Sequence, residues 1–192
     1  MRIRHGVLSY GPVILYLCKG RHKGAQMLGY VLAPERGDAD LLISAVAAQL
    51  QALGWPLAGA VQQNRMEGAS RCTMELVVLQ ADRRICISQQ LGSGSKGCRL
   101  DSAALEQAVG LVEAALDQSP RLLILNKFGK AEAEGRGFRP LIGRALGLGI
   151  PVLIGVNARN IEAFHSFAEG MAMALPANEA DLLDWCHAHV LP

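Results

Sequence analysis

An uninterrupted aliphatic run, Leu122-Leu123-Ile124-Leu125, limits the folds that are open to this chain. A strand without a polar position has no face for solvent, and such strands are typical of parallel sheets that helices cover on both sides. The segment Pro151-Val152-Leu153-Ile154-Gly155-Val156 predicts a second strand of this kind. The sequence therefore favours an α/β protein with a buried parallel sheet.

Strand-like and helix-like segments alternate from Met27 onward, which predicts a three-layer α/β fold with a mostly parallel sheet and helices on both faces. Two short segments joined by Gln80-Ala81-Asp82-Arg83 predict an antiparallel hairpin. The predicted strands are 28–33, 57–62, 72–79, 84–89, 122–125 and 151–156, and the predicted helices are 39–53, 102–116, 138–148, 160–169 and 178–190. Asp38 and Asp101 are predicted to cap the first two helices.

The chain of 192 residues is long enough for one domain with a sizeable core, and we predict a single domain over 27–192. Its five cysteines are scattered and form no C-x-x-C pair, so the sequence indicates neither a disulfide framework nor a metal site. A reducing, cytoplasmic location is the expectation.

The net charge of +2 comes from the first 26 residues. They hold five basic residues and no acid, so the rest of the chain has 14 basic and 17 acidic residues. This balance argues against bulk nucleic-acid binding. The segment 1–26 is a basic leader, too short in its apolar part to span a bilayer. One interpretation is that translation starts at Met27.

The loop after the first predicted strand lacks the elements of a Walker A motif, namely a lysine followed by a hydroxyl residue. Asp38 and Asp40 stand at the start of the helix, where two carboxylates would repel a phosphate. Asp38 either caps the helix, or one of the two acids receives a cation or a ribose hydroxyl.

A second loop, 91–101, places three glycines, a lysine and an arginine directly before a helix. Such a loop can form an anion-binding nest of backbone N–H groups, although a flexible connector has the same composition. Its candidate ligand-binding residues are Gly92, Gly94, Lys96, Gly97 and Arg99.

The segment that follows the aliphatic run is the richest in ligand-binding side chains. It supplies Asn126, Lys127, Gly129 and Lys130, with Arg139 further along as a secondary candidate. Ligands of open α/β sheets collect past the carboxyl ends of the strands, so these cations predict a small anionic ligand. Glu132 and Glu134 either pair with the cations and organise the loop, or bind a metal or act in catalysis.

From Met27 the chain resembles a bacterial family known as domain of unknown function 2478. The resemblance rests on Gln62-Gln63-Asn64, Ile87-Ser88-Gln89-Gln90-Leu91-Gly92, Gly97-Cys98-Arg99-Leu100-Asp101, Asn126-Lys127-Phe128-Gly129-Lys130 with Glu132 and Gly135, and Gly149-Ile150-Pro151-Val152. Members of that family occur beside or fused to the ATP-binding subunits of molybdate importers. The resemblance thus implies molybdenum or oxyanion handling, with such a subunit as a partner.

The order of segments also resembles the thermophilic-type nucleoside triphosphatases, which implies a degenerate P-loop-like fold. In those enzymes a strand ends in D-E-x-G-x-x-E, whereas here Asn126 and Lys127 replace the acid pair and Glu132 matches the last acid. Two hypotheses follow. The first is a protein that binds a nucleotide or an oxyanion such as molybdate with little or no hydrolysis, and that serves molybdate uptake or molybdenum cofactor supply as a sensor or carrier. The alternative is an active nucleoside triphosphatase that uses Glu132 or Glu134.

Overall fold

The computed structural model describes residues 26–32, 37–67, 71–89 and 100–190. Their elements, in chain order, are β1 (Leu28–Val31), α1 (Asp38–Ala52), β2 (Leu57–Glu67), β3 (Arg71–Val78), β4 (Arg83–Cys86), α2 (Ser102–Leu116), β5 (Leu122–Phe128), α3 (Lys130–Ala133), α4 (Arg139–Gly147), β6 (Val152–Val156), the 3₁₀ helix η2 (Ala158–Asn160), α5 (Ile161–Ala168), β7 (Ala172–Leu175) and α6 (Glu179–His189).

The strands form one sheet in the order β4-β3-β2-β5-β6-β1-β7. β5 is parallel to both β2 and β6, and β1 is parallel to both β6 and β7. β3 runs antiparallel to β2 and to β4, which confirms the predicted hairpin between β3 and β4. The predicted three-layer, mostly parallel fold is confirmed.

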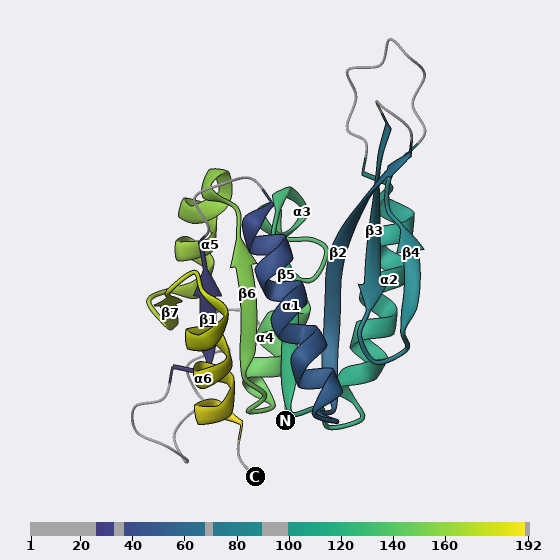
Figure 1. The fold of residues 1–192 in the computed structure, drawn as a ribbon. Helices are drawn as coiled ribbons and strands as arrows, with labels where there is room; N and C mark the ends of the chain where they lie inside the picture. The colour runs from purple at the N-terminus through teal and green to yellow at the C-terminus, as the bar shows by residue number, and fades with distance from the viewer. Residues whose placement is uncertain (1–25, 33–36, 68–70, 90–99, 191–192) are drawn as a thin grey trace, which may run out of the picture.

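Helices cover both faces of the sheet and enclose two cores. On one face α1 and α6 contribute Ile43, Leu50 and Leu182 to the core, and on the other face α2, α4 and α5 contribute Val112, Ile142 and Phe164. In Figure 1, α1 and α6 lie in front of the sheet and α2 and α4 behind it. Every residue of β6 is buried, as predicted from the apolar segment 151–156. No helix in the described part of the chain combines the length and apolar character that crossing a bilayer requires.

Two strands are longer than the sequence predicted. β2 continues to Glu67, where a loop was expected after Gln62, and pairs with β3 from Ala60 to Glu67. The antiparallel partner satisfies the backbone of this polar stretch, so no aliphatic pattern is needed to keep it extended. In Figure 1 this pair rises beyond the neighbouring strands. β5 continues through Asn126 and Lys127 to Phe128, beyond the predicted end at Leu125.

The N-terminal caps of two helices can be compared with the prediction. Asp101 caps α2 as predicted, because its side chain accepts hydrogen bonds from the N–H groups of Ala103 and Ala104. The prediction that Asp38 caps α1 is wrong by one residue, since Gly37 occupies the cap position with a φ of 100° and Asp38 is already helical. A left-handed φ of this kind favours glycine over aspartate. The short helix α3 was not predicted.

Candidate functional site

A bulge in β5 forms the centre of the candidate site. Leu125 pairs with Ile154 and Phe128 pairs with Val156, so three steps along β5 match two steps along β6. Leu125 and Phe128 consequently belong to the same core although they are three residues apart. One extra residue in a strand bends it and redirects side chains, and such bulges are common beside binding sites. The bulge places Asn126 and Lys127 at the carboxyl edge of the sheet.

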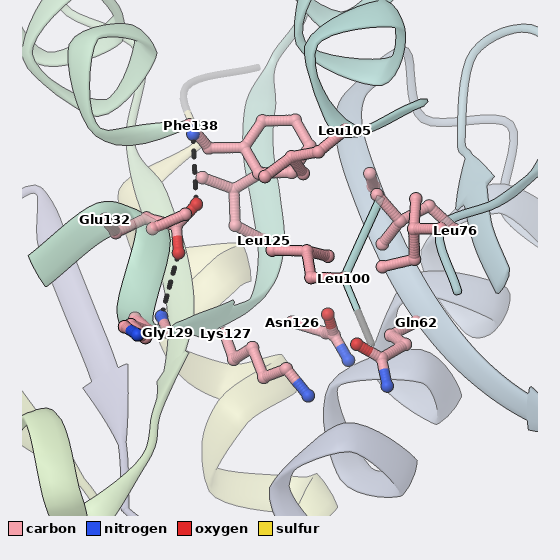
Figure 2. Close-up of a pocket in the computed structure, with 14 residues that line it drawn as sticks. Gln62, Leu76, Leu100, Leu105, Leu125, Asn126, Lys127, Gly129, Glu132 and Phe138 are labelled. Atoms are coloured by element: carbon pink, nitrogen blue, oxygen red, sulfur yellow. Dashed lines mark hydrogen bonds between the residues drawn. The ribbon is translucent and has the colours of Figure 1, made fainter. Parts of the chain in front are cut away.

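A pocket of about 100 Å³ lies beside this bulge, on the face of the sheet that carries α2 and α4. Leu76, Leu100, Leu105 and Phe138 form much of its apolar wall (Figure 2). The polar side chains that line it are Gln62, Asn126, Lys127, Lys130 and Glu132. The pocket therefore combines an apolar wall with a polar end that contains two lysines.

Asn126 is buried at the polar end of this pocket, with 3% of its surface exposed. Its Nδ2 atom has no hydrogen-bond partner among the described residues. Gln62 is also buried, at 6% exposure, but its Nε2 donates to Oδ1 of Asn64 at 2.7 Å. Figure 2 shows the amides of Asn126 and Gln62 at the same end of the pocket. A buried donor without an acceptor is rare and costs free energy, so a binding role would explain Asn126.

Lys127 extends from the bulge to the first turn of α1, where its Nζ lies 3.5 Å from Oδ2 of Asp40. The side chains of Lys127 and Asp40 are 35% and 15% exposed. The carboxylate of Asp40 occupies the N-terminal end of the helix, where the backbone dipole favours negative charge. Asp38, in the same turn, is exposed. The structure thus pairs one predicted cation with one of the two predicted acids.

Glu132 is held by the backbone around it. Its Oε2 accepts from the N–H of Gly129 at 2.9 Å, and its Oε1 accepts from the N–H of Phe138 at 3.1 Å. Gly137 has a φ of +60°, and a Cβ there would lie 2.3 Å from Oε1, so the loop closes tightly over the carboxylate. Burial raises the pKa of Glu132 above its usual 4.5, although both N–H groups and Lys127 lower it. With both oxygens engaged, Glu132 joins α3 to the start of α4.

The other charged candidates contact neighbouring groups. Glu134 forms ion pairs with Lys130, at 3.7 Å, and with Arg136. Its pKa is lowered, chiefly by the hydrogen bond from Arg136. Arg139 donates to the carbonyl oxygen of Glu132 at 3.4 Å and lies over the ring of Phe167. Lys130, at 76% side-chain exposure, is the more accessible of the two pocket lysines.

The predicted glycine-loop residues Gly92, Gly94, Lys96, Gly97 and Arg99 lie outside the described residues. On either side of that loop, Ile87 and Leu100 both line the pocket. Gln62 was predicted at the end of a strand, but its place in the pocket was not predicted. The sequence feature that could have indicated this place is an amide side chain directly after the buried run Leu57–Val61. The described residues contain no group of three or more His, Cys, Asp or Glu side chains that could hold a metal ion.

The fold and the edge site define a three-layer α/β protein with a candidate ligand site at the carboxyl edge of its mostly parallel sheet. A solved structure of a human cancer-related nucleoside triphosphatase has a similar fold, with a TM-score of 0.51 and 18% identity over 82% of this chain and 93% of that chain. The chain belongs to the family described as "Protein of unknown function (DUF2478)", which matches residues 28–185.

A relative in Bradyrhizobium diazoefficiens is "Molybdenum import ATP-binding protein ModC 2", which is 36% identical over 156 residues. This match covers 81% of the chain but only 17% of the relative. The chain therefore corresponds to a small segment of that larger protein.

Proposed function

We propose that this protein binds a small anionic ligand, a nucleotide or an oxyanion such as molybdate, at the carboxyl edge of its sheet. The contact between Lys127 and Asp40 carries this proposal. A lysine ammonium faces a carboxylate at the N-terminus of a 15-residue helix, an environment that suits negative charge. A ligand with one or more acidic groups can compete with Asp40 for Lys127 and reach Lys130, which lines the same pocket.

The same edge argues against ordinary magnesium-dependent hydrolysis. Asn126 and Lys127 stand where the related nucleoside triphosphatases carry acids, and a lysine cannot bind Mg²⁺. Both oxygens of Glu132 accept from backbone N–H groups, which holds this carboxylate in a structural role. Glu134 is exposed and paired with two cations. We therefore propose a binding protein whose hydrolytic activity is weak or absent.

The relative's name supports a link to molybdenum import. We propose a role in molybdate uptake or in molybdenum cofactor supply. In this proposal the protein acts as a sensor or carrier, and its partner is the ATP-binding subunit of a molybdate importer. The matched segment is a small part of the relative, which suits an accessory role beside the ATPase.

Two measurements test the proposal. A thermal-shift panel of ATP, GTP, molybdate, tungstate and sulfate should identify at least one stabilising anion. Phosphate release from ATP or GTP with Mg²⁺ should stay near background. A turnover of about 1 per second or faster would favour the alternative, an active nucleoside triphosphatase, because this is the lower end of ordinary enzymes. Glu132→Gln and Glu134→Gln would then show which acid supplies the activity.

Lys127→Ala should weaken binding of the best anion by about tenfold, the loss of one charge-assisted hydrogen bond. Arg144→Ala is the matched control, because it removes the same charge from α4, where Arg144 pairs with Glu113 and Asp117. Equal affinity in the wild type and Lys127→Ala would refute the edge site.

A further inference from the structure

The pocket beside Lys127 is poorly suited to a bare oxyanion. Leu76, Leu105 and Phe138 line it, and none of these side chains can replace the water that a tetrahedral anion loses on entry. The carboxylate of Glu132 also borders the pocket and would repel an anion inside it. The charge of Lys127 is directed toward Asp40 at the edge. The interior thus favours a neutral, largely apolar group.

The amide of Asn126 adds a polar requirement to the apolar character of the ligand. The buried Nδ2 of Asn126 is a hydrogen-bond donor without an acceptor among the described residues, and its side chain lines the pocket (Figure 2). Buried donors are nearly always satisfied, and an acceptor atom on a bound molecule would supply the missing partner. A carbonyl oxygen or a ring nitrogen meets this requirement without bringing a negative charge.

We propose that the pocket takes the base of a nucleotide, with the ring against Leu76, Leu105 and Phe138 and a ring carbonyl or nitrogen accepting from Nδ2 of Asn126. The phosphate then lies at the rim, beside Lys127 and Lys130. This inference rests on the proposed function. It narrows the ligand of the same site to a nucleotide, which is an organic anion with a flat ring. A bare oxyanion is excluded from the pocket.

Uncharged nucleosides measure the contribution of the ring to binding without that of the phosphate. The full chain is titrated with adenosine, guanosine, cytidine and uridine, with their 5′-monophosphates, and with molybdate and inorganic phosphate. Calorimetry gives the affinities, and the side-chain ¹⁵N–¹H resonances of Asn126 report whether Nδ2 gains an acceptor. We expect at least one nucleoside to bind and to shift these resonances, whereas molybdate and inorganic phosphate leave them in place.

Asn126→Leu keeps the size of the side chain and removes the donor, so it should weaken nucleoside binding by about tenfold. Gln118→Leu removes an exposed amide that bonds to Gln80 and should leave nucleoside affinity unchanged. The inference is overturned if no nucleoside binds, if Asn126→Leu binds nucleosides as the wild type does, or if molybdate itself shifts the Asn126 resonances.

Failure of the proposed function has a different signature. A 5′-monophosphate should bind more tightly than its nucleoside, and Lys127→Ala should reduce that difference. If the anions bind through Lys127 while nucleosides do not bind, the edge site stands and the base pocket is refuted. If nucleosides bind through Asn126 while the phosphate adds nothing, the base pocket stands and the anion site is refuted.

Discussion

Gly155 on β6 faces the backbone carbonyl of Asn126 so closely that a Cβ at position 155 would lie 2.2 Å from that oxygen. The bulge in β5 and the glycine in β6 are therefore one structural unit, since a larger residue would push the two strands apart. The position of Asn126 and Lys127 at the pocket depends on this close approach.

Gly155→Ala should destabilise the protein and weaken ligand binding together. The added methyl group meets backbone, which cannot move without loss of strand pairing, so we expect a loss of about 1–3 kcal/mol in the free energy of unfolding. Urea unfolding measures this loss. Gly110→Ala is the control, because a Cβ there meets nothing within 4 Å and helix α2 should gain about 0.5–1 kcal/mol. A neutral Gly155→Ala variant would mean that the bulge tolerates a wider strand spacing.

Asn126→Leu should make the protein more stable while it weakens nucleoside binding. The buried Nδ2 has no partner among the described residues, and replacement by an apolar group of similar size removes that cost, about 1–3 kcal/mol at most. Gln62→Leu is the matched comparison, because Nε2 of Gln62 bonds to Asn64 and no gain is expected there. Thermal unfolding of both variants measures the difference. A clear loss of stability in Asn126→Leu would show that the amide already has a partner.

Asp40→Asn should strengthen anion binding. The change leaves the ammonium of Lys127 without its carboxylate partner and removes one negative charge from the edge. Partly exposed ion pairs contribute about 0.2–1 kcal/mol, so the affinity should rise by up to about fivefold. Asp38→Asn removes the same charge from the same helical turn without touching this pair and should have a smaller effect. Weaker binding in Asp40→Asn would show that Asp40 holds the ligand.

The sequence predicts the sheet well where burial alone determines the structure. β5 and β6 were predicted because their aliphatic residues leave no face for solvent. The second half of β2, from Gln63 to Glu67, was missed because most of its residues are polar and its extended form depends on β3. Pairing with another strand, here the next one along the chain, leaves no periodic pattern in the local sequence.

The candidate site was likewise predicted only in part. The sequence places Asp40 and Lys127 at one edge of the sheet, and the structure brings them within 3.5 Å although 87 residues separate them. The bulge, the unpartnered amide of Asn126 and the pocket wall depend on strand register and helix packing, which residue types alone do not reveal. Glu132 was a candidate for either loop organisation or chemistry, and its two backbone hydrogen bonds become visible only when Gly129 and Phe138 are placed.

Glu132→Gln tests the organising role of this carboxylate through stability and pH. Glutamine keeps one acceptor oxygen but turns an NH₂ group toward the N–H of Gly129 or Phe138, so the variant should lose about 1–3 kcal/mol.

The pH dependence of this loss follows from the raised pKa of Glu132, which burial dominates. An acid whose pKa in the folded state is raised above its usual 4.5 contributes its full stabilisation when the pH is below 4.5. This stabilisation is lost as the pH rises through the folded-state pKa. Glutamine does not titrate, so the stability gap between the wild type and Glu132→Gln should be larger at about pH 4 than at about pH 7. Urea unfolding of both proteins at the two pH values measures the gap, with Glu134→Gln as the control. The pKa of Glu134 is lowered, so its gap should change in the opposite direction. A gap for Glu132→Gln that grows with pH would show that its hydrogen bonds and Lys127 outweigh burial.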